Sequence, residues 1–200
     1  MNQNNNTINS MSRNQNLVSR ERFGFPGWMK SIFAGIVLLM LANASAFAQS
    51  EEGIKSAFMY NFGKLTQWPA TAFANDAAPI NVGFVGADTL ADLFEKNITG
   101  KNANGREFVV KKLSGAEGVA SCQIVFVGND AMVADVLGAA KGKPVLTVGE
   151  SEAFVAGGGI IKFFRDGAKV AFDLDVGAAK FAELKFDEKL IKIAKNVKGG

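Results

Sequence analysis

Residues 157–175 show the most regular alternation of apolar and polar residues in the chain. Two runs with the composition of β-strands, residues 160–165 and 168–174, are separated by Asp166 and Gly167. An Asp-Gly dipeptide tolerates the positive φ angles of a type I′ turn, which joins two antiparallel strands through two residues. This pattern predicts a β-hairpin with Asp166 and Gly167 at its tip.

The predicted turn sets the register of the hairpin. Phe163 would lie opposite Val170 and Ile161 opposite Phe172, so that these four side chains share one face. We expect this face to lie in the core. The opposite face carries Phe164 among charged and small residues, which is typical of a face that is half solvated or covered by a helix or a partner.

A helix is predicted from residue 51 up to Trp68-Pro69, where proline prevents the helix from continuing. Its apolar residues recur at three- and four-residue spacing. The expected core-facing side chains are Ile54, Ala57, Phe58, Phe62 and Leu65. Tyr60 lies off this stripe, which places it either against a partner or in a satisfied position at the helix end.

Strands alternate with helices after residue 79. Strands are predicted for residues 80–85, 106–113, 122–127 and 144–148, and helices for residues 88–97, 132–140, 176–184 and 187–197. Asp88 is the expected cap of the first of these helices. Phe181 and Leu184 are expected to face inward from the first of the two closing helices. This order is typical of parallel strands with helices on both faces. The sequence therefore predicts an α/β fold, a three-layer sandwich with a largely parallel sheet and a C-terminal antiparallel β-hairpin.

The N-terminal part of the chain has the pattern of an export signal. Lys30 precedes a run of about eleven apolar residues and an Ala-Phe-Ala sequence before Gln49, which is typical of a cleavable signal peptide. The apolar run is shorter than the roughly 20 residues that a membrane-spanning helix needs. We therefore assign residues 29–48 to a signal peptide, residues 1–28 to an extension or a misassigned start, and residues 49–200 to one α/β domain in the periplasm.

Composition excludes several kinds of chemistry. Removal of residues 1–48 takes away four basic side chains and one acidic one, and the remaining chain is neutral, without the basic patch that nucleic-acid binding needs. The chain has no histidine and a single cysteine, Cys122, which excludes histidine-based triads and Cys/His metal sites. Cys122 lies in an apolar strand, where a buried thiol is expected. The sequence thus indicates a binding protein rather than an enzyme, with no cofactor and no metal.

Three short motifs suggest ligand sites, but each has a simpler structural interpretation. Residues 157–159 are three glycines that lead into a strand, whereas phosphate loops lead into a helix. Gly83 and Gly86 follow a strand but lack the spacing of a dinucleotide fingerprint. Asp173 and Asp175 are a carboxylate pair, but a hard cation needs more oxygen ligands at defined spacing.

Several segments together resemble the YfiR family of periplasmic regulators. The helix sequence AFMYNF at residues 57–62 with Trp68-Pro69 resembles the opening helix of that family, and CQIVFV at residues 122–127 resembles one of its strands. PVLTV at residues 144–148 and the segment from GGGII to FDLD at residues 157–175 match further family motifs in the same order. The resemblance covers nearly all of residues 51–197.

The resemblance implies a periplasmic α/β protein, often dimeric, that represses an inner-membrane diguanylate cyclase by binding its periplasmic sensor region. Such a protein lowers cyclic di-GMP and restrains biofilm formation. Some members of the family have disulfides, but Cys122 has no partner cysteine in this chain. The family pattern also ends its hairpin strand in Asn, where this chain has Asp175.

Two functions are the main candidates after these considerations, and a structural adaptor for an outer-membrane receptor is a third alternative. The first is a regulator that binds a membrane signalling protein, and we expect Tyr60 or Phe164 or both to contact that partner, because aromatic residues dominate interface energetics. The alternative for Phe164 is cover by a closing helix. The second function is a periplasmic small-molecule binding module, with its ligand in the crevice at the carboxyl ends of the strands near Gly86 and Gly128.

Overall fold

The computed structural model describes residues 51–199. The predicted signal peptide and the extension before it lie outside these residues. Within the described part of the chain, no helix is long and apolar enough to cross a membrane.

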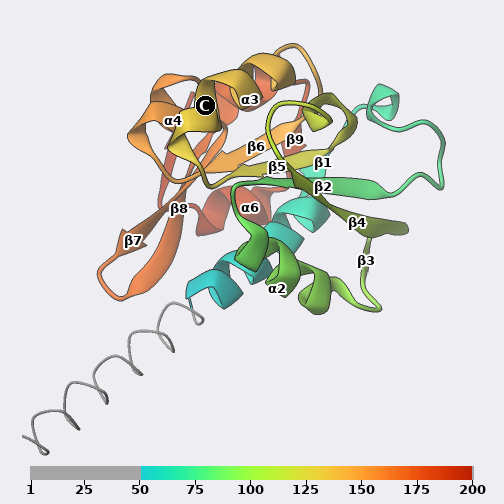
Figure 1. Ribbon diagram of the computed structural model, residues 1–200, viewed down its shortest axis with the longest axis horizontal. Helices are drawn as coiled ribbons and strands as arrows, with labels where there is room; N and C mark the ends of the chain where they lie inside the picture. Colours follow the sequence, from blue (N-terminus) through green and yellow to red (C-terminus); the bar gives the residue numbers. More distant parts are fainter. Residues whose placement is uncertain (1–50, 200) are drawn as a thin grey trace, which may run out of the picture. The chain divides into compact units, whose positions relative to one another are not determined.

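The fold is built on a mostly parallel, eight-stranded sheet in the order β10-β8-β7-β6-β5-β2-β4-β3 (Figure 1). Its strands are β2 (Ile80–Val85), β3 (Asn102–Ala103), β4 (Arg106–Leu113), β5 (Ile124–Val127), β6 (Leu146–Gly149), β7 (Ile161–Asp166), β8 (Lys169–Asp175) and β10 (Asn196–Lys198). Strands β4, β2, β5, β6 and β7 run parallel, and the β7–β8 hairpin is antiparallel. The predicted fold class is confirmed.

Helices cover both faces of the sheet, as parallel βα units require. A helix over residues 51–65, α2 (Asp88–Ile98) and α6 (Glu188–Ile193) lie on one side, and α3 (Val133–Ala140) and α4 (Glu152–Ala156) lie on the other (Figure 1). Helix α5 (Val176–Phe181) follows β8 directly. The remaining elements are the 3-10 turns η1 (Ala70–Ala72), η2 (Val119–Ser121) and η3 (Asp130–Met132), and a two-stranded sheet of β1 (Thr66–Gln67) and β9 (Lys185–Phe186).

Each face of the sheet has its own core. The core under the helix of residues 51–65 contains a group of aromatic rings, in which Phe62 and Phe163 stack at 5.5 Å between ring centroids and Phe62 meets Phe172 edge-on at 5.0 Å. The second core, between the sheet and α3 and α4, is rich in valine and contains Phe154 and Cys122. Aromatic pairs of this geometry add to the stability that burial alone provides.

The hairpin forms where the sequence predicts it, but the predicted register is wrong. Phe163 pairs with Phe172 and Asp166 pairs with Lys169, so the turn consists of Gly167 and Ala168. Of these two turn residues only Gly167 has a positive φ, which is the pattern of a turn with glycine in its first position. The predicted type I′ turn, centred on Asp166 and Gly167, would require a positive φ at Asp166 as well. The shift of two residues along one strand leaves the predicted buried face unchanged.

The helix of residues 51–65 is rotated relative to the predicted stripe. Ile54 is 40% exposed, whereas Met59 and Phe62 are fully buried and Lys55 is buried beside them. The spacing of apolar residues predicts the wrong buried face because the first turn of the helix buries the charged side chain of Lys55, which pairs with glutamates. The predicted capping role of Asp88 is also wrong, since Ala87 occupies the cap position of α2 and makes no side-chain cap bond.

The end of the chain departs most from prediction. Helix α5 stops at Phe181 instead of continuing to residue 184, and the predicted last helix is replaced by α6 and the edge strand β10. Strand β10 pairs with β8, and the N–H of Lys195 donates to the carbonyl of Phe172 just before β10 begins. Backbone pairing to the edge of the sheet therefore outweighs the helical pattern of residues 194–197.

Candidate interaction groove

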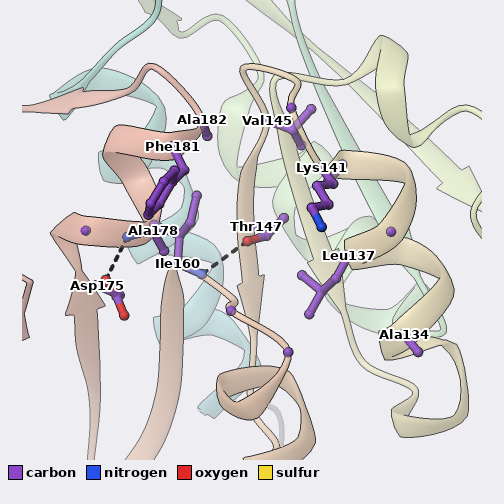
Figure 2. A pocket seen from close by; sticks show the side chains of 16 residues that line it. Ala134, Leu137, Lys141, Val145, Thr147, Ile160, Asp175, Ala178, Phe181 and Ala182 are labelled. Atoms are coloured by element: carbon purple, nitrogen blue, oxygen red, sulfur yellow. Dashed lines mark hydrogen bonds between the residues drawn. The ribbon is translucent and has the colours of Figure 1, made fainter.

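An apolar groove of about 810 Å³ lies between α3 and α5, at the amino-terminal ends of β6 and β7 (Figure 2). Its floor is formed by Val145, Thr147 and Ile160, which are all buried. The two walls are formed by the α3 side chains of Ala134 and Leu137 with Gly138 and Lys141, and by Ala178, Phe181 and Ala182 at α5. We call this feature the α3/α5 groove.

Phe181 lies on the rim of the groove and is 89% exposed, which contradicts its predicted inward position. The reason is the way in which α5 ends. Glu183 adopts a left-handed φ of 57°, the N–H of Leu184 donates to the carbonyl of Ala179, and the N–H of Glu183 donates to that of Lys180. This is the hydrogen-bond pattern of a Schellman motif. The reversal places Leu184 in the core and leaves Phe181 outside.

The triple glycine that precedes β7 serves packing. A Cβ atom on Gly159 would lie 2.1 Å from the ring of Phe154, and one on Gly157 would lie 2.6 Å from Leu137. Gly158 has a φ of 85°, a backbone angle that residues with a side chain rarely adopt. These residues let the chain pass closely over Phe154 into β7, and two of them, Gly157 and Gly158, line the groove.

A buried lysine lies near the carboxyl end of β6, opposite to the end at which the groove lies. Lys55 is 5% exposed, and its ammonium pairs with Glu150 at 2.6 Å, Glu52 at 3.0 Å and Glu51 at 3.1 Å. Burial alone would lower the pKa of Lys55, but the hydrogen bonds and charges of the three glutamates outweigh it and raise that pKa above its ordinary range. The cluster ties the first helix to the segment that follows β6.

Tyr60 is half-buried and has several internal contacts. Its hydroxyl donates to the carbonyl of Asn102 at 3.2 Å, and its ring lies 5.6 Å from that of Phe108. The ammonium groups of Lys64 and Lys101 lie 5.7 and 5.2 Å from the ring centroid. These contacts connect the first helix to β3 and β4, so Tyr60 has a structural role whether or not it also meets a partner.

Phe164 lies on β7 and pairs with Ala171, on the hairpin face turned away from Phe163. It is half-buried and is not among the apolar side chains that pack on either core. Tyr60 and Phe164 do not share one surface, because Tyr60 contacts β3 and β4, whereas β7 lies on the other side of β6, β5 and β2 in the sheet.

The predicted crevice at the carboxyl ends of the strands contains two smaller hollows, of about 380 and 580 Å³, and Gly86 lines both. Gly128 lines the larger hollow and needs to be glycine, since a Cβ there would lie 2.8 Å from the carbonyl oxygen of Gly86. The two strand-end aspartates do not converge on an ion: Asp173 accepts from Asn196, and Asp175 caps α5 and pairs with Lys198 at 3.6 Å.

The family of the protein follows from comparison with known sequences. The family model described as YfiR/HmsC-like matches residues 52–195, which include both cores, the groove and, of the lysine cluster, every member except Glu51. The chain belongs to this family. The predicted resemblance is thus confirmed, and the family is one of periplasmic regulators of diguanylate cyclase signalling rather than of known enzymes.

Other comparisons give more distant likenesses. None of the curated proteins matches the chain. A conserved domain protein of Vibrio cholerae O1 biovar El Tor is 12% identical, with 59% of this chain and 54% of that chain covered and a TM-score of 0.39. An ABC domain in complex with L-Trp from Streptococcus pneumonia is 11% identical, with 59% and 55% covered and a TM-score of 0.42. The chain spans little more than half the length of these two structures.

Cys122 is the single cysteine of the chain and lies in the second core. The thiol is 2% exposed, and its sulfur lies 3.4 Å from the carbonyl oxygen of Gly118. Burial raises the pKa of the Cys122 thiol, which disfavours the reactive thiolate. The predicted burial is confirmed, and the thiol is structural in the folded protein.

Proposed function

We propose that this YfiR/HmsC-like protein is a periplasmic, non-enzymatic regulator that binds and represses the sensor region of an inner-membrane diguanylate cyclase and so lowers cyclic di-GMP. Family membership supports the regulatory role. The observation that carries the binding role is Phe181, a large aromatic side chain that is 89% exposed beside an apolar groove. Exposed aromatic residues next to pockets are common anchors of protein interfaces.

The proposed partner surface consists of the α3/α5 groove and Phe181 on its rim. Phe164 and Tyr60 are proposed as further contacts. Truncation of an interface anchor costs more than about 1 kcal/mol of binding free energy, which corresponds to about a fivefold loss of affinity. Because Phe181 contributes little to the core, its truncation should leave the stability of the fold nearly unchanged.

The test is complementation in cells that lack the gene. Deletion should raise cellular cyclic di-GMP, the wild-type chain should restore the low level, and the Phe181→Ala variant at equal abundance should restore it only in part. Ile193→Ala is the matched control, because Ile193 is 51% exposed on α6 and does not line the groove. Unchanged cyclic di-GMP after deletion, or full restoration by Phe181→Ala, would contradict the proposal.

The proposed contacts of Tyr60 and Phe164 are tested by replacing each residue by Ala and measuring both the melting temperature and the binding of the partner. Replacement of Tyr60 by Ala removes a hydrogen bond and a ring contact and should lower the melting temperature, whereas Phe164→Ala should lower partner binding more than stability. If both variants lower the melting temperature strongly, or if both leave stability and partner binding unchanged, neither residue is an interface contact. Light scattering of the purified protein tests the dimer that the family resemblance implies.

A further inference from the structure

The α3/α5 groove has a single free charge in its lining. The ammonium group of Lys141 points into the groove (Figure 2) and has no ion-pair or hydrogen-bond partner among residues 51–199. The other polar side chains of the lining are engaged. Thr147 accepts from the N–H of Ile160 at 3.1 Å, and Asp175 accepts from the N–H of Ala178 at 2.7 Å and pairs with Lys198. The groove therefore presents an aliphatic surface and one unpaired cation.

Several residues in the lining of the groove have little or no side chain. A Cβ atom on Gly138, Gly142 or Gly158 would meet no atom within 4 Å, so these positions border open space. The volume of about 810 Å³ lies within the range of roughly 300–1,000 Å³ that is typical of small-molecule sites.

We propose that the groove binds an unbranched acyl carboxylate. The acyl chain would lie on Val145, Ile160 and Leu137 beneath the ring of Phe181, and the carboxylate would pair with Lys141. An aliphatic chain fits better than an aromatic amine or an amino acid, because the side chains of the lining offer one aromatic ring and leave no carboxylate free for an ammonium group. This ligand site lies at the ends of the strands opposite the Gly86 crevice, and it overlaps the proposed partner surface at the groove and Phe181. Its test uses the protein alone and therefore does not depend on the proposed regulatory function.

The test is calorimetric titration of the purified protein with dodecanoate and with dodecanol, each below the concentration at which it aggregates. Dodecanoate should bind with one equivalent per chain and more tightly than dodecanol. The Lys141→Gln variant should lose about fivefold in affinity for dodecanoate, as expected for an exposed ion pair, and should bind dodecanol as the wild type does. Equal weakening of both ligands, or no saturable binding of dodecanoate, would overturn the proposal.

Gly138 provides the matched pair of variants that locates the ligand. Gly138→Leu should project four carbon atoms into the groove and weaken binding of both ligands, whereas Gly138→Ala adds only one carbon atom and should retain it. Neither substitution meets an atom at the Cβ position, so both chains should fold, which circular dichroism checks. If a folded Gly138→Leu variant binds dodecanoate as tightly as Gly138→Ala, the ligand does not occupy this groove. Because the titration uses no partner protein, its outcome is independent of the cyclic di-GMP experiment.

Discussion

Replacement of Lys55 by methionine is the sharpest test of the electrostatics of this fold. Methionine keeps the length of the buried stem but removes the cation that pairs with Glu51, Glu52 and Glu150, of which Glu51 keeps a second partner in Arg165 at 3.6 Å. Breaking a fully buried ion pair costs about 3–5 kcal/mol because a charge is left uncompensated. These three glutamates are between 22% and 41% exposed, so water screens part of their repulsion.

We therefore expect Lys55→Met to lower the free energy of unfolding by about 2 kcal/mol at neutral pH, below the fully buried limit. For a domain of this size, that corresponds to a fall in melting temperature of roughly 4–8 °C. The assay is urea denaturation followed by circular dichroism. The control is Lys192→Met, which breaks the exposed pair with Glu188 and should cost no more than about 0.5 kcal/mol.

The pH dependence gives the same cluster an independent signature. The pKa of Lys55 is raised in the folded state, so the folded chain holds its proton more tightly than the unfolded chain. The stability that the cluster contributes is fully present below the ordinary lysine pKa of 10.5 and is lost as the pH rises through the raised value. The stability difference between wild type and Lys55→Met should therefore begin to narrow above about pH 10.5.

Equal destabilisation by Lys55→Met and Lys192→Met, or a difference that does not change between pH 8 and the alkaline limit of folding, would refute this account of the cluster. The double variant Lys55→Met with Glu150→Gln should be less destabilised than the sum of its two single variants, because the second substitution removes one of the repelling charges.

Three further predictions follow from packing and backbone conformation. Phe163→Ala should cost about 3–5 kcal/mol of unfolding free energy, whereas Phe164→Ala, one residue further on the half-solvated face, should cost markedly less; similar losses would contradict the assigned faces. Glu183→Gly should stabilise the fold by up to about 1 kcal/mol, since glycine relieves the left-handed conformation at the end of α5, and a loss of stability would argue against that termination. Cys122 should react with iodoacetamide slowly until the protein is denatured, and rapid labelling of folded protein would exclude its burial.

The sequence alone determined the central strands of this protein. Strands β2 and β4 begin and end at the predicted residues, since their residue composition is that of strands and no competing pattern overlaps them. The buried face of the hairpin was also predictable, because a shift of two residues in register preserves which side chains share a face. A further hairpin signal in the sequence is the Asn-Gly dipeptide at residues 104–105, where both residues have a positive φ and form the turn between β3 and β4.

Tertiary structure decided the features on which the proposals rest. The burial of Lys55 depends on Glu150, which the sheet brings to the first helix from a distant part of the chain, and local periodicity carries no information on such a contact. The exposure of Phe181 depends on the left-handed backbone of Glu183, two positions later. Glutamate rarely adopts this conformation, so the sequence does not predict it. The groove itself combines α3, the glycines before β7 and α5, so its volume and the free charge of Lys141 exist only after these elements pack around the sheet.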